Sequence, residues 1–194
     1  MNSLQNALGL LDVFTPAAPV WSTEELISYS RYSRSTCYRY IRVLQNAGFL
    51  APVANGSYVL GPRIIELDRY IRLCDPVYTA GGGPMQRLTA KTGYSAILNI
   101  LYSNAVVCVR EELSPSSPPN LFSRGQKRPL LLGAASKVIL ANLAAHQLRR
   151  LYANQRKAIA MAGLGGDYVS LRKALRKIRK DGYCITSGEV IPNI

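Results

Sequence analysis

The hydrophobic pattern of the first 60 residues predicts three short helices and then a β-hairpin. Ser22 and Glu25 stand three residues apart at the start of the second helix, as in a capping box. The third helix follows from Ser33 and repeats apolar residues every three or four positions, so one of its faces is expected to be buried. That face consists of Cys37, Tyr40, Ile41 and Leu44.

The hairpin is predicted over residues 49–60, directly after Gly48, which is expected to end the third helix. Asn55-Gly56 supplies its turn, because a type I′ turn needs positive φ at both central residues. A capped helix, a turn, a basic helix and a hairpin in this order predict a winged helix-turn-helix. That arrangement places its recognition helix in the major groove of DNA.

After the hairpin the pattern predicts a helix over residues 62–80, started by Gly61-Pro62 with proline in the first turn. The three glycines and the proline of residues 81–84 are expected to break the chain as a flexible linker. Further elements are expected at residues 85–91 (helix), 94–102 and 105–110 (antiparallel strands), 134–144 and 168–180 (helices) and 182–186 (strand).

This mixture of helices and strands makes the fold class α+β. We expect a winged helix-turn-helix domain over residues 1–61, a linker helix over 62–80 and a second domain over 81–194. The net charge is +13, but residues 1–75 hold seven Arg and six Asp or Glu, whereas residues 76–194 hold seventeen Lys or Arg and five Asp or Glu. The charge therefore favours nucleic acid only as a general attraction.

The predicted DNA contacts lie on the polar side of the third helix and on the wing. The N-terminal part of a recognition helix reads base edges, and its flanks hold phosphates. The residues placed for bases are Arg34, Ser35 and Tyr38, and those placed for phosphate or mixed contacts are Thr36, Arg39 and Arg42. The wing offers Asn55, Gly56, Ser57 and Tyr58, with no Lys or Arg. The alternatives are an amphipathic surface helix with solvated arginines and a hairpin that only packs on the helices.

A second basic segment lies near the C-terminus, opposite an apolar helical stripe. A solvated helix face is the favoured interpretation, and a second nucleic-acid contact is the alternative. The cations of this helix are Arg172, Lys173, Arg176, Lys177, Arg179 and Lys180.

Catalytic and metal-binding patterns do not occur in the sequence. Cys37, Cys74, Cys108 and Cys184 have no metal-ligand spacing and are expected to be buried thiols. His146 is expected at the surface, and no phosphate-binding glycine loop or nucleophile elbow occurs. We therefore expect neither an enzyme nor a cofactor. The start of the chain has no basic n-region and no apolar run is long enough for a bilayer, which predicts a cytoplasmic protein.

Several motifs resemble the IclR family of bacterial transcriptional regulators. The N-terminal ones are residues 21–26, 35–41, 44–50 and 58–63. Residues 129–141 are similar to the family's helix in the effector domain, and residues 178–189 are similar to the segment before its last strands.

The resemblance implies a homodimer or tetramer that binds double-stranded operator DNA and carries a GAF-like α/β effector domain for a small metabolite. Its linker helix would help to dimerise the DNA-binding domains. Ser136 stands where the family usually has glycine, and Leu131 where a histidine is common. Because family members continue beyond the region of Val190, we expect either a fragment of a longer protein or an incomplete effector domain. The candidate effector-pocket residues are Tyr94, Cys108, Leu131 and Gly133.

The alternative hypothesis is a protein-interaction module on a winged-helix scaffold, with a basic second half and no specific DNA target. A DNA binder differs from such a module in losing duplex affinity steeply as salt rises.

Overall fold

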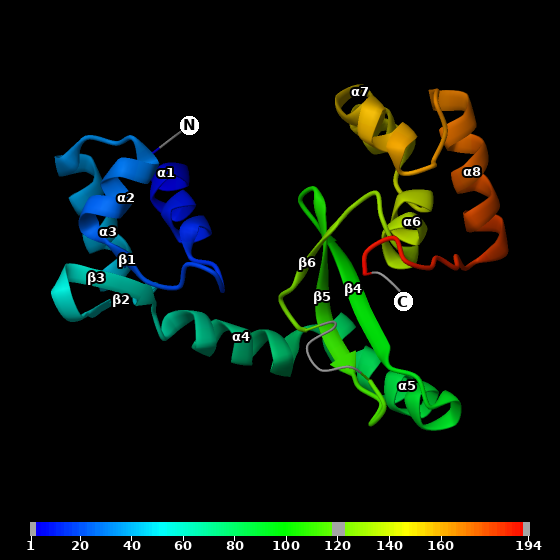
Figure 1. Cartoon of the computed structure of the whole chain (residues 1–194). Helices are drawn as coiled ribbons and strands as arrows, with labels where there is room; N and C mark the ends of the chain where they lie inside the picture. Colours follow the sequence, from blue (N-terminus) through cyan, green and yellow to red (C-terminus); the bar gives the residue numbers. More distant parts are fainter. Residues whose placement is uncertain (1–2, 118–122, 192–194) are drawn as a thin grey trace. The chain divides into compact units, whose positions relative to one another are not determined.

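The computed structural model describes residues 3–117 and 123–191 and divides into two compact units, residues 1–79 and 80–194 (Figure 1). Unit 1 contains a three-stranded sheet of order β1-β3-β2 and the helices around it. Its elements are α1 (Ser3–Gly9), η1 (Leu10–Val13), β1 (Trp21–Ser22), α2 (Thr23–Ser30), α3 (Arg34–Asn46), β2 (Leu50–Val53), η2 (Ala54–Gly56), β3 (Ser57–Leu60) and α4 (Arg63–Cys74).

The predicted helix starts of unit 1 are confirmed. The Ser22 hydroxyl accepts a hydrogen bond from the Glu25 backbone N–H at 3.2 Å, and the Glu25 carboxylate accepts one from the Ser22 N–H at 2.7 Å. This capping box holds the pKa of Glu25 below its ordinary value, because the Ser22 N–H stabilises the charged form. The expected inner face of α3 is buried together with Leu26 of α2 and Leu10 of η1.

The wing forms where it was predicted, with a different turn and an additional strand. Val53 pairs with Ser57, so residues 54–56 make a three-residue connection instead of a two-residue turn. Asn55 and Gly56 both have positive φ, at 59° and 66°, as the sequence predicted. The two residues of β1 pair antiparallel with β3, and a strand this short leaves no alternating pattern in the sequence.

The helix predicted over residues 62–80 is in fact the whole of one helix, α4, followed by the start of another. α4 ends at Cys74, and Asp75 is extended, with φ −69° and ψ 119°. Asp75 precedes Pro76, whose ring disfavours helical backbone at the preceding residue. α5 then starts at Pro76 and continues to Thr92.

The break predicted at residues 81–84 is wrong, because α5 runs through all four residues. The glycines instead allow this helix to lie close to the sheet. A Cβ on Gly81 would come within 2.8 Å of a Leu98 methyl carbon, and one on Gly82 within 2.8 Å of the Arg110 guanidinium. The sequence predicted that these glycines break the chain, but they allow the helix to pack closely against the strands.

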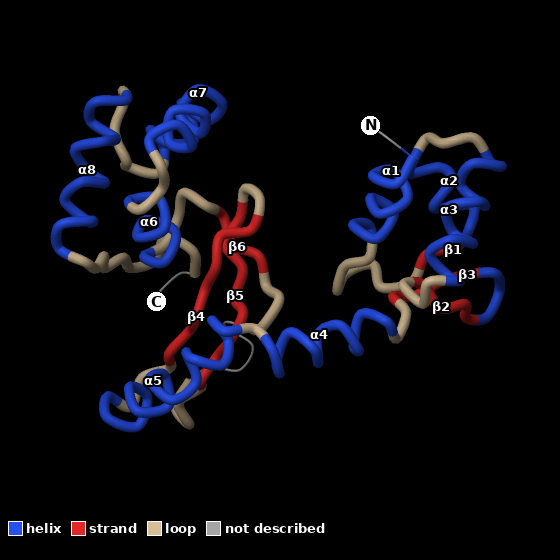
Figure 2. The backbone as a smooth tube through the Cα atoms, turned by 180° about the vertical axis from the view of Figure 1, so that it is seen from behind, coloured by secondary structure: helices blue, strands red, loops and turns tan. Residues whose placement is uncertain are grey.

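Unit 2 combines an antiparallel sheet of order β4-β5-β6 with helices. In Figure 2, α6 and α8 lie side by side, whereas α5 lies near the end of the sheet at which β4 begins. The core includes Leu140, Ile159 and Leu171, all almost fully buried. The elements are α5 (Pro76–Thr92), β4 (Ala96–Tyr102), β5 (Ala105–Glu112), β6 (Lys127–Pro129), α6 (Ala134–Ala141), α7 (Ala145–Met161) and α8 (Tyr168–Asp181).

Three sequence-based results need correction, two in unit 2 and one among the cysteines of both units. Residues 182–186 do not form a strand. The helix α7 was not predicted, and its periodicity is interrupted at Gln155, whose φ of −133° is not helical. Of the four cysteines, Cys37 and Cys108 are buried, which raises the pKa of both thiols, but Cys74 is exposed and Cys184 is half-buried. In the described residues no helix combines the length and the apolar character that a membrane span needs.

Candidate nucleic-acid interface and effector cavity

The orientation of α3 is fixed by its cap and by its buried face. The Ser33 hydroxyl accepts a hydrogen bond from the Thr36 backbone N–H at 3.3 Å and donates one to the Thr36 hydroxyl at 2.9 Å. Tyr40 and Ile41 are at most 5% exposed and hold the inner side of the helix in the core. Because the helix cannot rotate without exposing these residues, the opposite side faces solvent.

That solvent-facing side carries most of the predicted DNA contacts. Thr36 is half-buried, and its hydroxyl is already bonded to Ser33. A groove of about 600 Å³ runs between α3, from Tyr38 to its C-terminal end, and Tyr58 of β3. Its polar and aromatic lining includes Tyr38, Arg39, Arg42, Gln45, Asn46 and Tyr58. The exposed predicted residues of α3 are Arg34, Ser35, Tyr38, Arg39 and Arg42.

Gln45 and Asn46 were missed by the sequence analysis, although they lie three and four residues after Arg42 and therefore on the same helix face. Their amides can donate and accept hydrogen bonds, which suits base edges as well as phosphates. The groove brings together four of the predicted residues, Tyr38, Arg39, Arg42 and Tyr58. Arg34, Ser35 and Thr36 are not among its lining residues.

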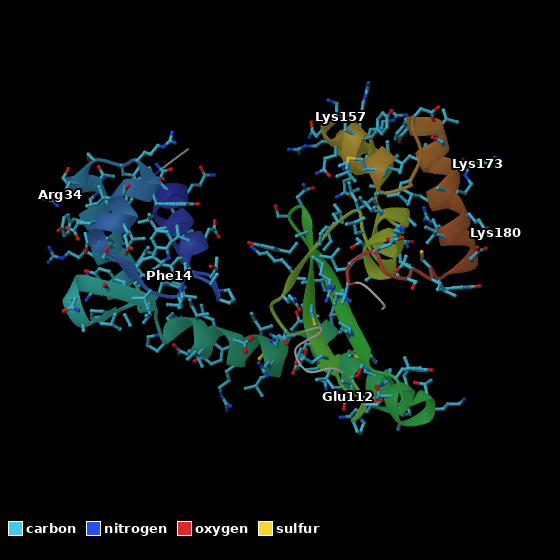
Figure 3. The ribbon with its side chains drawn as sticks, viewed as in Figure 1. Phe14, Arg34, Glu112, Lys157, Lys173 and Lys180 are labelled. Carbon is cyan, nitrogen blue, oxygen red and sulfur yellow. The ribbon has the colours of Figure 1, made fainter. Side chains whose placement is uncertain are left out.

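Arg34 already forms an ion pair within the chain. Its guanidinium lies 3.3 Å from a carboxylate oxygen of Glu24 in α2, and both side chains are about two-thirds exposed, at 69% and 67%. Figure 3 shows Arg34 at the outer side of the helical part of unit 1. Exposed pairs of this kind contribute little stability, so the guanidinium can exchange Glu24 for another anion.

The wing presents polar groups without charge. Asn55 and Gly56 are exposed at its tip, and Ser57 and Tyr58 are half-buried. The Gly56 carbonyl accepts a hydrogen bond from the Thr23 hydroxyl at 3.2 Å, which ties the tip to α2. The wing therefore has a defined position relative to α2 and α3.

Unit 2 contains a cavity of about 360 Å³ between the sheet and the N-terminal end of α6. Arg128 lines it while being only 8% exposed, and this burial lowers the pKa of its guanidinium. The remaining lining comes from β4, from the start of α6 and from the segment after α8. It consists of Ser95, Ile97, Asn99, Leu132, Gly133, Ala134, Ala135, Ser136, Thr186, Glu189, Val190 and Ile191.

Of the four predicted effector residues, Gly133 lines this cavity. Cys108 and Leu131 are buried outside its lining, and Tyr94 is 78% exposed. Arg128 and Asn99 were missed, because their inward orientation depends on how β4 and β6 pair with β5. Within the described residues no group of three or more His, Cys, Asp or Glu is placed to hold a metal ion.

A winged helix-turn-helix joined to an α/β unit with a polar cavity is the architecture of a DNA-binding regulator with a ligand-binding domain. Residues 3–54 match the IclR helix-turn-helix domain, and residues 75–194 match the C-terminal region of the bacterial transcriptional regulator IclR. The chain therefore belongs to the IclR family of DNA-binding, ligand-controlled transcriptional regulators. This confirms the resemblance and the fold class inferred from the sequence.

Individual relatives agree with this assignment. The chain is 24% identical over 197 residues to the probable HTH-type transcriptional regulator ArcR of Halobacterium salinarum, covering 100% of this chain and 74% of the relative. An IclR regulator structure from Alicyclobacillus acidocaldarius has a TM-score of 0.78 at 23% identity, covering 98% of this chain and 77% of that one. An IclR homologue from Microbacterium hydrocarbonoxydans, complexed with 4-hydroxybenzoate, has a TM-score of 0.72 at 17% identity, covering 98% and 79%.

Proposed function

We propose that the solvent-facing side of α3 reads a specific DNA duplex and that the wing supports it. Arg34, Ser35 and Tyr38 would reach base edges, and Thr36, Arg39 and Arg42 would hold phosphates or make mixed contacts. The wing residues Asn55, Gly56, Ser57 and Tyr58 would meet the backbone or the minor groove. The observation that carries this proposal is the groove that places Arg39 and Arg42 beside Tyr58 of the wing.

The proposal is tested by fluorescence anisotropy on genomic fragments from upstream of the gene. Arg34→Ala and Arg39→Ala should abolish specific binding with the circular dichroism spectrum unchanged, because both side chains are exposed. The matched control is Arg87→Ala on α5, which removes one exposed arginine from the other unit. Wild-type affinity in both α3 variants would refute the assignment of the reading helix.

We propose a homodimer, which is supported by the two-fold symmetry of operators and by the exposed apolar side chains of α4. A single recognition helix reads few base pairs, and two-fold symmetry doubles the contact. No residue of α4 is buried, and Ile65 and Leu73 are 75% and 59% exposed. The helix would therefore bury its apolar side chains against a second copy. Sedimentation of Ile65→Glu should give a monomer, whereas Glu66→Gln on the same helix should leave the dimer intact.

We assign the effector site to the cavity beside α6 and expect an anionic small molecule there. Arg128 supplies a buried positive group among the lining residues, and Glu189, the one carboxylate of that lining, is already paired with Lys137. 4-Hydroxybenzoate is the first probe, with 4-hydroxybenzyl alcohol as the uncharged control. The carboxylate should raise the melting temperature of wild type but not of Ala135→Leu, in which the cavity is filled. An equal effect of the alcohol would contradict the anionic assignment.

This function needs no catalysis, and we propose that the chain is not an enzyme. Its DNA target makes the cytoplasm of a prokaryotic cell the expected place of action.

A further inference from the structure

The outer face of α8 carries six exposed cations in two rows. Arg172, Arg176 and Arg179 form one row at intervals of four and three residues, and Lys173, Lys177 and Lys180 form the other. The opposite side of the helix holds Leu171 and Leu175, at most 3% exposed, in the core of unit 2. Figure 3 shows Lys173 and Lys180 pointing away from α6. Packing therefore fixes all six cations on the solvent side.

No ion pair within 4.0 Å joins the six cations to a carboxylate in the described part of unit 2. Asp167 caps the helix through Ser170, and Glu189 pairs with Lys137. Asp181, the last residue of α8, is the one acidic residue on the helix itself. The helix dipole favours cations only in the last turn, which accounts for Arg179 and Lys180. Like charges four residues apart, such as Arg172 and Arg176, destabilise a helix. The arrangement thus gives the isolated helix no stability.

Aromatic contacts extend the basic face from α8 to α7. The Arg172 guanidinium lies 6.0 Å from the centre of the Tyr168 ring, and the Tyr168 ring lies 5.5 Å from that of Tyr152 in α7. The Arg156 guanidinium lies 5.1 Å from the centre of the same Tyr152 ring. Arginine on an aromatic face is held in place while its N–H groups stay available. Arg156 and Arg172 are thereby linked into one surface.

We propose that this basic face of α8, continued by Arg156, binds the phosphate backbone of duplex DNA without reading its sequence. Each row spans seven residues, or about 10 Å of helix, which is close to three base-pair steps along one DNA strand. The face lies on the unit that holds most of the net positive charge, in a protein whose target is already DNA. It would add a salt-dependent affinity that is separate from the specific contacts of α3.

The test is the salt dependence of binding to a duplex of random sequence, measured by anisotropy with the full chain. Arg172→Gln/Arg176→Gln/Arg179→Gln should lower the slope of log K against log salt by about 0.9 per lost phosphate contact, or up to about 2.7 per chain. The Lys173→Gln/Lys177→Gln/Lys180→Gln variant should act similarly. The control, Arg87→Gln/Lys91→Gln/Lys127→Gln, removes three exposed cations from α5 and β6 and should change the slope little.

The same measurement in an Arg34→Ala/Arg39→Ala background separates this face from α3. Residual duplex binding should persist there and should weaken further when the arginine row is also replaced, with the lysine row left to account for what remains. The proposal fails if either row variant keeps the wild-type slope, or if the control changes it equally. It also fails if the rows affect binding of single-stranded RNA but not of duplex DNA.

Discussion

Glu189 closes the N-terminal end of α6, because its Oε2 accepts a hydrogen bond from the Gly133 backbone N–H at 2.9 Å. The same carboxylate forms an ion pair with Lys137 in the first turn of that helix. Burial raises the pKa of Glu189, but the Lys137 ammonium and the Gly133 N–H outweigh it, so the pKa lies below its ordinary value. The segment after α8 is thus held to α6 by charge at the edge of the cavity beside α6.

Replacing this carboxylate should destabilise unit 2 in a pH-dependent way. Glu189→Gln keeps the shape but removes the charge, and we expect unfolding free energy to fall by about 1–2 kcal/mol at neutral pH. Because the folded-state pKa is lowered, the stabilisation is complete above the ordinary value of 4.5 and is lost as the pH falls through the folded value. Urea unfolding of both proteins should therefore converge in acid. A constant difference at all pH values would contradict the role of the charge.

Glu24 should restrain DNA binding through Arg34. Glu24→Gln frees the guanidinium from its ion pair and removes a negative charge beside the reading helix. An exposed pair contributes about 0.2–1 kcal/mol, so we expect operator affinity to rise by up to about fivefold at low salt. Glu66→Gln on α4 is the charge-matched control. Unchanged affinity in Glu24→Gln would show that Arg34 does not exchange partners on binding.

Gly61 should tolerate no side chain. A Cβ there would lie 2.2 Å from the Gly48 carbonyl oxygen and 2.9 Å from the Leu50 nitrogen, and these are backbone atoms that cannot turn aside. Gly61→Ala should therefore destabilise unit 1 by about 1–3 kcal/mol or more in thermal unfolding. Gly9→Ala is the control, since no atom lies within 4 Å and the backbone is helical. It should be neutral or stabilising by up to about 1 kcal/mol.

The two cores should respond separately to truncation. Leu26 and Leu171 are each at most 1% exposed, one in the core of each unit. Leu26→Ala and Leu171→Ala should each cost about 2–5 kcal/mol. Calorimetry with hydrogen exchange should assign each loss to its own unit. If both variants lower the protection of both cores equally, the units unfold as one.

Local signals predicted the elements of unit 1 well, because its helix starts and its wing depend on neighbouring residues. Ser22, Ser33 and Asn55 each act within three residues of themselves. The two serines cap their helices as expected, and Asn55 has the expected positive φ, although in a three-residue connection. The break at Asp75 was also predictable, because a proline follows it. The apolar stripe along residues 62–80 suggested one continuous helix instead.

The features that the sequence did not predict depend on tertiary contacts, which a local sequence pattern does not show. Gly82 looks like a chain breaker until Arg110 is placed beside it. Arg128 looks like a surface arginine until β6 pairs with β5 and turns it inward. The pairing of Glu189 with Lys137 spans 52 residues, so neither residue suggests the other.

The uncharged wing has a consequence for how this chain would find its target. Contacts made by Asn55 and by backbone atoms release no counter-ions, so they keep their strength as ionic strength rises. The basic face of α8 would weaken under the same conditions. Sliding along the chromosome would then depend on α8, and stopping at a site would depend on α3 and the wing. Ionic strength would change the rate of the search, whereas the choice of site would remain with α3 and the wing.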